Sequence, residues 1–135
     1  MDINVHVTDG IHGHPAEGVG VRVTSCRGGM GDTEIEKARG RTDRDGQFRC
    51  FERITSIIKG GKYSIEIDAD IYFASLGISC WQQKVALLFC VIDPGDEYEV
   101  TSVLTPFMQA TYCIRRLRGS APEYYNEHSR ANEAP

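Results

Sequence analysis

The stretch DEYEVTSVLTPF alternates polar and apolar side chains as a half-buried strand does, and it sets two carboxylates on one face. These are Glu97 and Glu99. Three further groups with acid, base or anion-binding chemistry hold outward positions of other alternating runs: His6 in INVHVT, and Gln47 and Arg49 in QFRCF. These residues predict a polar outer sheet face that could bind and transform a small molecule if another subunit covered it, although acidic residues on such a face are often only solvated.

Composition and charge narrow the class of protein. The chain has 135 residues, 41% of them hydrophobic and 25% charged, which suits one globular domain with a buried core. Its formal net charge is -4, so it lacks the basic excess that nucleic-acid phosphates attract. The longest apolar run, VALLFCVI, falls well short of the roughly 20 residues that a membrane-spanning helix needs. We therefore expect neither a nucleic-acid partner nor a membrane.

The N-terminal residues and the cysteines indicate a compartment. Strand-like alternation begins by Ile3, which leaves no room for the charged, apolar and cleavage regions of a secretory signal. The cysteines are odd in number and form no CxxC pair, which favours reduced thiols packed in strands over disulfides or a zinc site. We expect a cytoplasmic protein without a metal or a cofactor. The five cysteines are Cys26, Cys50, Cys80, Cys90 and Cys113.

Short alternating runs separated by turn residues recur along the chain and predict an all-β fold of about eight strands. In VGVRVTS, for example, Val21 and Val23 should point inward while Arg22 and Thr24 point outward. The run WQQKVALLFCVID is apolar enough to predict the most buried strand. The other predicted strands lie in INVHVT, TEIEKARGRT, QFRCF, KYSIEIDA, EYEVTSVL and QATYCIRRL.

Two stretches depart from the alternation. DADIYFASLG opens with Asp68 and Asp70 as caps and closes on a glycine, which predicts one short helix around residues 70–77. The last residues, 121–135, are polar and predict a flexible tail after a single domain of residues 1–120.

Four stretches of the chain resemble the transthyretin-like family, whose enzymes are 5-hydroxyisourate hydrolases. They are VHVTDGIHGHPAEGVGVRV, TDRDGQF, GKYSIEIDADIYFASLG and YEVTSVLTPFMQATY, and they follow the family's order and spacing over about residues 3–120. The resemblance implies an eight-stranded, two-sheet sandwich with one short helix. It also implies a homotetramer, a dimer of dimers with active sites in a channel between the dimers. A dimer is the alternative assembly, because clustered carboxylates could weaken the second interface.

The family's catalytic positions transfer unevenly onto this sequence. HVTD matches the pattern around the first catalytic histidine, which implies that role for His6. The family's arginine after an Asp-Gly turn is replaced by Gln47, and the nearest guanidinium is Arg49, one same-face step along the strand. EYEV aligns with a stretch that holds two histidines, so Glu97 and Glu99 stand in their places, with Glu99 at the catalytic position.

The C-terminal Tyr-Arg-Gly-Ser signature of the family is either absent after Tyr112 or occurs late, as Arg118, Gly119 and Ser120. The resemblance and the residue types together predict a catalytic group and a substrate-binding group of residues. The catalytic group is His6, Glu99 and Arg49, and the substrate-binding group is Gln47, Glu97, Tyr112, Arg118 and Ser120.

Each assignment has a purely structural alternative. His6 could be an ordinary strand histidine, the two glutamates could be solvated, and Tyr112 could simply pack. RRLRGS could be a basic strand end instead of an anion clamp. His12 and His14 lie in the turn-rich stretch DGIHGHPAEG and have no third ligand at a useful spacing, so we expect loop residues there, not metal ligands.

Three functions are compatible with this pattern. The preferred one is an enzyme diverged from the hydroxyisourate hydrolases, a hydrolase or cyclase that acts on a cyclic amide, lactone or related heterocycle by acid and base chemistry centred on His6. Glu99 would orient that imidazole and stabilise its protonated form. The alternatives are a working 5-hydroxyisourate hydrolase of purine breakdown with an unusual site, and a non-catalytic small-molecule carrier like transthyretin itself.

Overall fold

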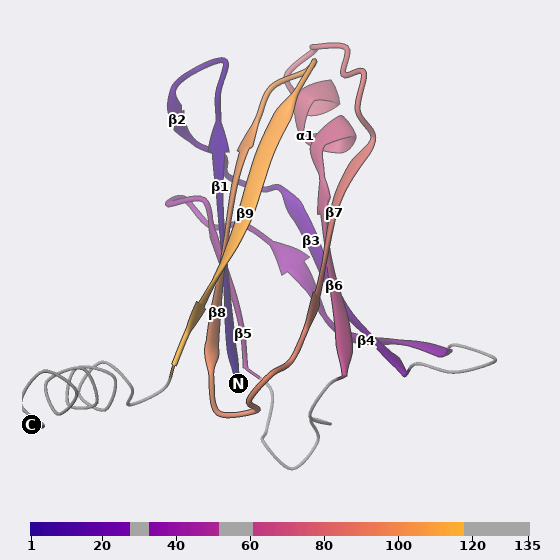
Figure 1. The fold of residues 1–135 in the computed structure, drawn as a ribbon. Coiled ribbons are helices and arrows are strands. Elements are labelled where there is room, and N and C mark those ends of the chain that lie inside the picture. The colour runs from indigo at the N-terminus through magenta and orange to yellow at the C-terminus, as the bar shows by residue number, and fades with distance from the viewer. Residues whose placement is uncertain (28–32, 52–60, 118–135) are drawn as a thin grey trace, which may run out of the picture.

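The chain folds as a sandwich of two β-sheets with one short helix, shown in Figure 1 for a computed structural model that describes residues 1–27, 33–51 and 61–117. Eight of the strands have five or more residues, and one more is a two-residue strand. The elements are β1 (Asp2–Asp9), β2 (His14–Pro15), β3 (Gly20–Arg27), β4 (Thr33–Arg41), β5 (Gln47–Phe51), β6 (Lys62–Asp68), α1 (Ala69–Ser75), β7 (Lys84–Cys90), β8 (Glu97–Leu104) and β9 (Gln109–Arg116).

The strand order places the first strand of the chain in the middle of the first sheet. In this five-stranded sheet, β1 pairs with β2 and β5 along one edge and with β8 along the other, and β9 follows β8. The β1 and β8 strands are parallel, although they lie far apart in the sequence. The second sheet has the order β4-β3-β6-β7 and is antiparallel throughout. This architecture confirms the predicted transthyretin-like sandwich.

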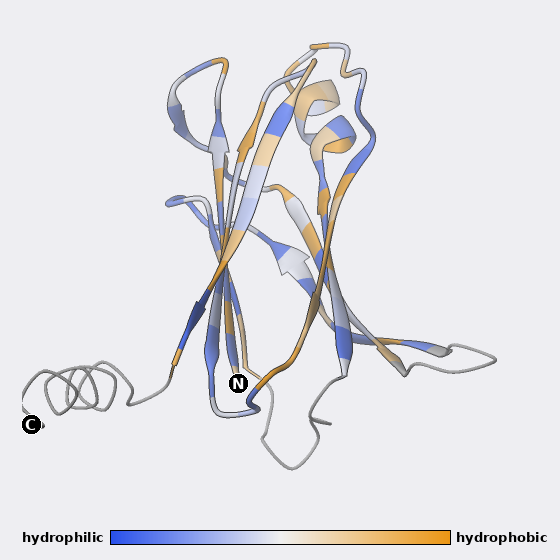
Figure 2. Cartoon of the chain, in the orientation of Figure 1, coloured by the Kyte–Doolittle hydropathy of each residue, from blue (hydrophilic) through white to orange (hydrophobic). Residues whose placement is uncertain are grey.

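The core lies between the inner faces of the two sheets and follows the predicted alternation. On β1, Ile3, Val5 and Val7 are buried, while the residues between them stay partly exposed. Ile65 and Ile67 of β6 are fully buried in the opposite sheet. Figure 2 shows the resulting alternation of hydrophobic and hydrophilic residues along the strands. Because the period is two, the outward residues of β1 must share one surface.

The helix α1 follows β6 directly and closes one end of the sandwich. The Asp68 side chain caps it by accepting a hydrogen bond from the backbone N–H of Ile71, with 3.2 Å between the donor and acceptor atoms. Its own residue Phe73 is fully buried, and Gly77 takes a left-handed conformation with φ of 74° after its last turn. The predicted short helix is confirmed, with its bounds displaced by one or two residues.

Two local expectations are wrong. Thr24 is buried instead of outward, and it lies where the pairing of β3 with β4 shifts register between Val23 and Thr24. The stretch after β1 is not only a loop, since His14 and Pro15 pair with the end of β1 as the short strand β2.

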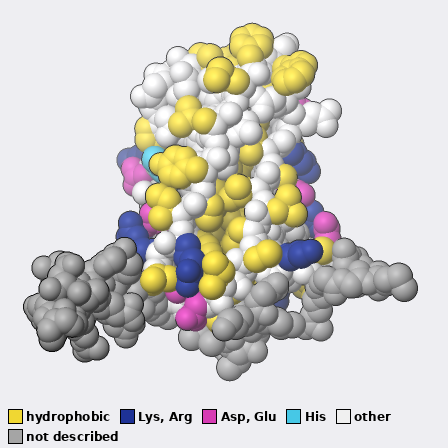
Figure 3. All heavy atoms as spheres, viewed as in Figure 1, with side chains coloured by type: hydrophobic (Ala, Val, Ile, Leu, Met, Phe, Trp, Pro, Cys, Tyr) yellow, Lys and Arg dark blue, Asp and Glu magenta, His cyan; other side chains and the backbone are white. Residues whose placement is uncertain are grey.

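The strand β7 is also less buried than its sequence indicates. It lies at the edge of its sheet, paired only with β6, and Leu88 at its centre is 73% exposed. Figure 3 shows hydrophobic side chains gathered on the side of the molecule where β7 and β9 lie. The apolar run therefore reflects an exposed edge, not burial on both faces.

The predicted tail, residues 121–135, lies outside the described residues, as do Arg118 and Ser120. Within the described part of the chain, no helix has the length and apolar character needed to cross a membrane.

Candidate functional site

Four of the predicted site residues meet on the outer face of the five-stranded sheet, where β5, β1 and β8 run side by side; they are His6, Gln47, Arg49 and Glu99. His6 of β1 lies directly opposite Gln47 of β5 and directly opposite Thr101 of β8. Residues that face each other across a ladder have their side chains on the same face of the sheet. The register therefore brings one residue from each of three strands into a single row.

A second row lies one same-face step away. Asn4 of β1 is opposite Arg49 of β5 and opposite Glu99 of β8. The Arg49 Nε–H donates a hydrogen bond of 2.7 Å to the Asn4 side-chain oxygen, which holds the guanidinium over the sheet. The fold thus confirms that Arg49 and Glu99 share the face of His6.

These two rows line an open hollow of about 300 Å³. Its wall carries an imidazole, a guanidinium, a carboxylate, two amides and a hydroxyl, all of which can hydrogen-bond a polar heterocycle. Its lining residues are Asn4, Val5, His6, Gln47, Arg49, Glu99, Val100 and Thr101.

The carboxylate of Glu99 is engaged with the neighbouring strand. Arg116 Nη2 donates a hydrogen bond of 3.3 Å to Glu99 Oε2. Between the described residues of one chain, neither a hydrogen bond nor an ion pair joins Glu99 to His6. Glu97 is opposite Asp2 on one side and opposite Arg116 on the other, and it does not line the hollow.

Beyond the hollow, the same face becomes apolar on β9. Tyr112 is opposite Thr101, and Ile114 is opposite Glu99, so both side chains extend the two rows. Tyr112 is 53% exposed, which contradicts the alternative that it simply packs. Arg118 and Ser120, the remaining predicted binding residues, fall outside the described part of the chain.

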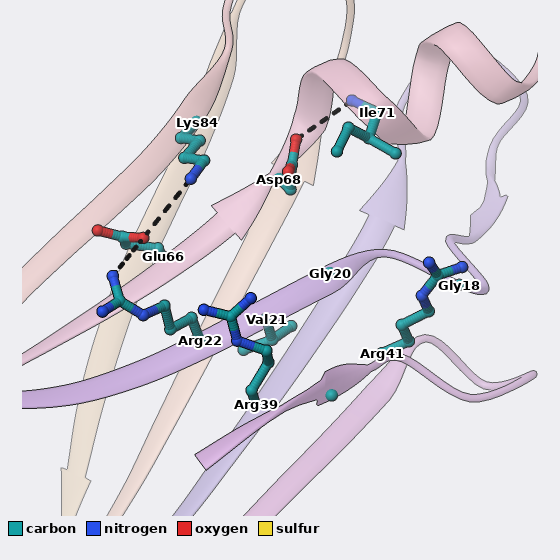
Figure 4. Close-up of a pocket in the computed structure, with 11 residues that line it drawn as sticks. Gly18, Gly20, Val21, Arg22, Arg39, Arg41, Glu66, Asp68, Ile71 and Lys84 are labelled. Carbon is teal, nitrogen blue, oxygen red and sulfur yellow. Dashed lines mark hydrogen bonds and ion pairs between the residues drawn. The ribbon is translucent and has the colours of Figure 1, made fainter. Parts of the chain in front are cut away.

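A larger hollow of about 470 Å³ lies on the outer face of the other sheet (Figure 4). Arg22 pairs there with Glu36 at 3.0 Å and with Glu66 at 3.6 Å, and Arg39 shares Glu36 at 2.7 Å. Exposed pairs of this kind are screened by solvent and contribute little to stability. This larger hollow contains none of the predicted site residues. We interpret its charged side chains as ion pairs between neighbouring strands.

A cluster of hydrogen-bonded side chains around Asp9 was not expected from the sequence. Asp9, at the end of β1, is fully buried, and its carboxylate accepts hydrogen bonds from the His12 ring at 2.7 Å and from the Tyr72 hydroxyl at 2.7 Å. Burial alone would raise the pKa of Asp9, but these bonds, with backbone N–H groups of His12 and Ile11, lower it from 3.8 to about 2. Burial and the adjacent carboxylate raise the pKa of Tyr72.

This cluster includes both histidines that the spacing assigned to a simple loop. Asp9, His12 and His14 each offer a ligand atom, and these atoms lie within 4.8 Å of one another. The sequence shows the two histidines two residues apart. It does not show that Asp9 lies next to them, because this depends on the strand register that sets Asp9 opposite His14.

The comparison with known families agrees with the resemblance. A family model described as the HIUase/Transthyretin family matches residues 3–113. The matched segment contains every residue that lines the hollow on the five-stranded sheet.

Proposed function

Since the chain belongs to the HIUase/transthyretin family, in which HIUase stands for 5-hydroxyisourate hydrolase, we propose that it is an enzyme that opens or rearranges a small heterocycle on the outer face of the five-stranded sheet. One observation carries the proposal. His6 and Arg49, an acid-base group and a fixed cation, line the same 300 Å³ hollow from neighbouring strands.

The chemistry requires only groups that line this hollow. His6 takes a proton from a water molecule as that water attacks a ring carbonyl carbon. The guanidinium of Arg49 stabilises the oxyanion that forms on the carbonyl oxygen. When the oxyanion collapses, the ring C–N or C–O bond breaks, and the leaving nitrogen or oxygen receives the proton back from His6. A cyclic amide or a lactone fits this sequence of steps.

The substrate should differ from 5-hydroxyisourate. By resemblance, Gln47 occupies the family's arginine position and Glu99 occupies a histidine position. An ionised carboxylate cannot donate a hydrogen bond to an oxyanion. Loss of one preorganised oxyanion donor typically costs about 100- to 1,000-fold in rate. We therefore propose that turnover of 5-hydroxyisourate is weak, and that the altered site serves another cyclic amide, lactone or related ring.

A carrier function is the second candidate, and the apolar border of the site favours it. Tyr112 and Ile114 continue the two polar rows as exposed apolar side chains. A face with such a border could hold an apolar ring without changing it. In that case the substitutions at the aligned positions would have ended catalysis and left binding intact.

Both candidates need the face to be covered, so we also propose a homo-oligomer, a tetramer or a dimer. An open hollow on one sheet leaves a bound ligand in contact with water, and a second copy would enclose it. Exposed apolar residues support such contacts. On β9 and the turn before it they include Phe107, Met108, Tyr112 and Ile114.

The test is a substrate panel that contains 5-hydroxyisourate, simple lactones and cyclic amides, followed by ultraviolet absorbance and by mass spectrometry of the products. The native protein and a His6→Ala variant are compared, with Thr8→Ala as the control because Thr8 shares the outer face of β1 outside the hollow. Turnover that disappears only in the His6 variant supports the enzyme. Tight binding of a ring by both variants without turnover supports the carrier instead.

A further inference from the structure

The hairpin between β1 and β2 brings two imidazoles close together, away from the hollow described above. Pairing of β1 with β2 sets Asp9 directly opposite His14. The turn between them is closed by the backbone N–H of Gly13, which donates to the Asp9 carbonyl oxygen at 2.9 Å. Gly13 has φ of 74°, a conformation that favours glycine. Figure 1 shows this hairpin at the same end of the sandwich as α1.

Both oxygens of the Asp9 carboxylate already accept two hydrogen bonds each. Its Oδ1 accepts from the backbone N–H groups of Ile11 at 2.8 Å and His12 at 2.9 Å. Its Oδ2 accepts from the Tyr72 hydroxyl and from the His12 ring, each at 2.7 Å. Because a carboxylate offers about four acceptor positions, Asp9 serves as a fixed support for its neighbours and not as a free ligand.

These contacts fix which nitrogen of each imidazole carries hydrogen. An ionised carboxylate only accepts hydrogen bonds, so His12 Nδ1 must be the protonated nitrogen toward Asp9. A backbone carbonyl also only accepts, and His14 Nδ1 lies 2.8 Å from the Pro15 carbonyl oxygen. In their neutral forms, both rings therefore keep an unprotonated Nε2 with a free lone pair.

This arrangement is the one that metal-binding histidines use. A histidine ligand almost always donates its second ring N–H to a carboxylate or a backbone carbonyl, which orients the ring and makes it a better ligand. Here the His12 ring is supported by the Asp9 carboxylate, and the His14 ring is supported by the Pro15 backbone carbonyl. The two rings stack nearly parallel, with centroids 5.5 Å apart and an angle of 14° between their planes, so the side chains must turn before both rings can bind one ion.

We propose that His12 and His14 bind a divalent transition metal ion through their Nε2 atoms, with Asp9 as the outer carboxylate that orients His12 and water in the remaining positions. Zn²⁺ is bound by imidazole nitrogen at about 2.0–2.1 Å, so two ligand atoms on one ion lie roughly 3.3 Å apart. One ligand atom from each of Asp9, His12 and His14 lies within 4.8 Å of the others. Both histidine side chains are exposed and can rotate to close this difference.

The site is independent of the proposed reaction. His6 lies on the outer face of β1, whereas the Asp9 side chain points inward toward α1, where it meets Tyr72. Imidazole nitrogen is a ligand for Zn²⁺, Ni²⁺ and Cu²⁺, whereas Mg²⁺ and Ca²⁺ prefer oxygen, so the latter two should not bind here.

The experiment is calorimetric titration of the full chain with Zn²⁺ after treatment with a chelator and its removal. The native protein is expected to bind one Zn²⁺ per chain at this site. His12→Ala and His14→Ala should each weaken binding by roughly tenfold or more, and Asp9→Asn by about 10- to 100-fold as a supporting group. His6→Ala is the matched control, since it removes a histidine outside the cluster, and Cys90→Ser removes an exposed thiol that could compete for the ion.

A second measurement does not depend on affinity. Nitrogen-15 NMR of the imidazole rings should report hydrogen on Nδ1 of His12 and His14 without metal, and Zn²⁺ should shift their Nε2 signals while leaving those of His6 unchanged. Circular dichroism verifies that each variant is folded. Unchanged Zn²⁺ affinity in the folded His14→Ala variant, or binding that only Cys90→Ser removes, would overturn the proposal.

Discussion

The Glu99 carboxylate accepts a hydrogen bond from the Arg116 guanidinium, with 3.3 Å between Oε2 and Nη2, and it makes this contact on the face that also carries His6. The two side chains are 31% and 63% exposed, and a pair this accessible contributes about 1 kcal/mol or less. Glu99 is therefore held only weakly. Across the pairing of β1 with β8, Glu99 lies opposite Asn4, one same-face step from Thr101, which lies opposite His6.

The first prediction concerns this pair of residues. We expect His6→Ala to lower kcat/KM for the natural substrate by about 100- to 10,000-fold, because the acid-base group is lost. If Glu99 orients His6, Glu99→Gln should lose nearly as much, and the double variant should lose no more than His6→Ala alone. Steady-state kinetics of the three variants and of Arg116→Ala measures the coupling. Losses that simply add would show that Glu99 acts apart from His6.

The second prediction separates binding from chemistry. Arg49→Ala should raise KM for a carbonyl-bearing or anionic substrate, because the guanidinium held by Asn4 over the hollow is lost. Arg44→Ala is the control, since Arg44 is an exposed arginine of the turn before β5 and does not line the hollow. Unchanged kinetic constants in Arg49→Ala would remove this residue from the site.

The third prediction concerns assembly. We expect light scattering at micromolar concentration to report a dimer or a tetramer. Ile114→Asp should shift the protein toward the monomer, because it places a charge on the outer face of β9. Ile71→Asp on α1 is the matched control, since Ile71 is also an exposed isoleucine but lies outside that sheet. A native protein that is monomeric under these conditions would exclude a site shared between copies.

The fourth prediction follows from the lowered pKa of Asp9, about 2 against an ordinary 3.8. A carboxyl whose pKa is lower when folded stabilises the fold above its unfolded pKa, and this stabilisation is lost as the pH falls through the folded pKa. For Asp9 it amounts to about 2 kcal/mol near neutral pH. Urea unfolding of the native protein and Asp9→Asn, with chelator present, should show a stability difference that shrinks between about pH 4 and pH 2. A difference independent of pH would contradict the assignment.

The fifth prediction concerns the turn that positions Gln47 and Arg49. Gly46 has φ of 73°, and a Cβ there would lie 2.4 Å from the Val7 carbonyl oxygen. Gly18 has φ of 80° but no atom within 4 Å of such a Cβ. Gly18→Ala should therefore cost about 1–2 kcal/mol of unfolding free energy from conformation alone, while Gly46→Ala should cost roughly 3 kcal/mol or more. Chemical denaturation of both variants measures this difference.

Much of the fold could be predicted from the sequence because it depends on local periodicity. Alternation with a period of two indicates which side chains of a strand face inward, and it correctly placed Ile3, Val5 and Val7 in the core and His6 outside. The loss of alternation and the cap at Asp68 likewise predicted α1. These features need no knowledge of which strands become neighbours.

The tertiary structure decided what depends on strand neighbours and register. Only the parallel pairing of β1 with β8 sets Glu99 opposite Asn4, and only the pairing of β8 with β9 brings Arg116 beside it. Pairing of β1 with β2 sets His14 opposite Asp9. The edge position of β7 follows from strand order, and the irregular pairing of β3 with β4 occurs beside the buried Thr24. Hydrophobic pattern fixes the face of a residue, but its partners come from segments far along the chain, brought together by packing of the two sheets.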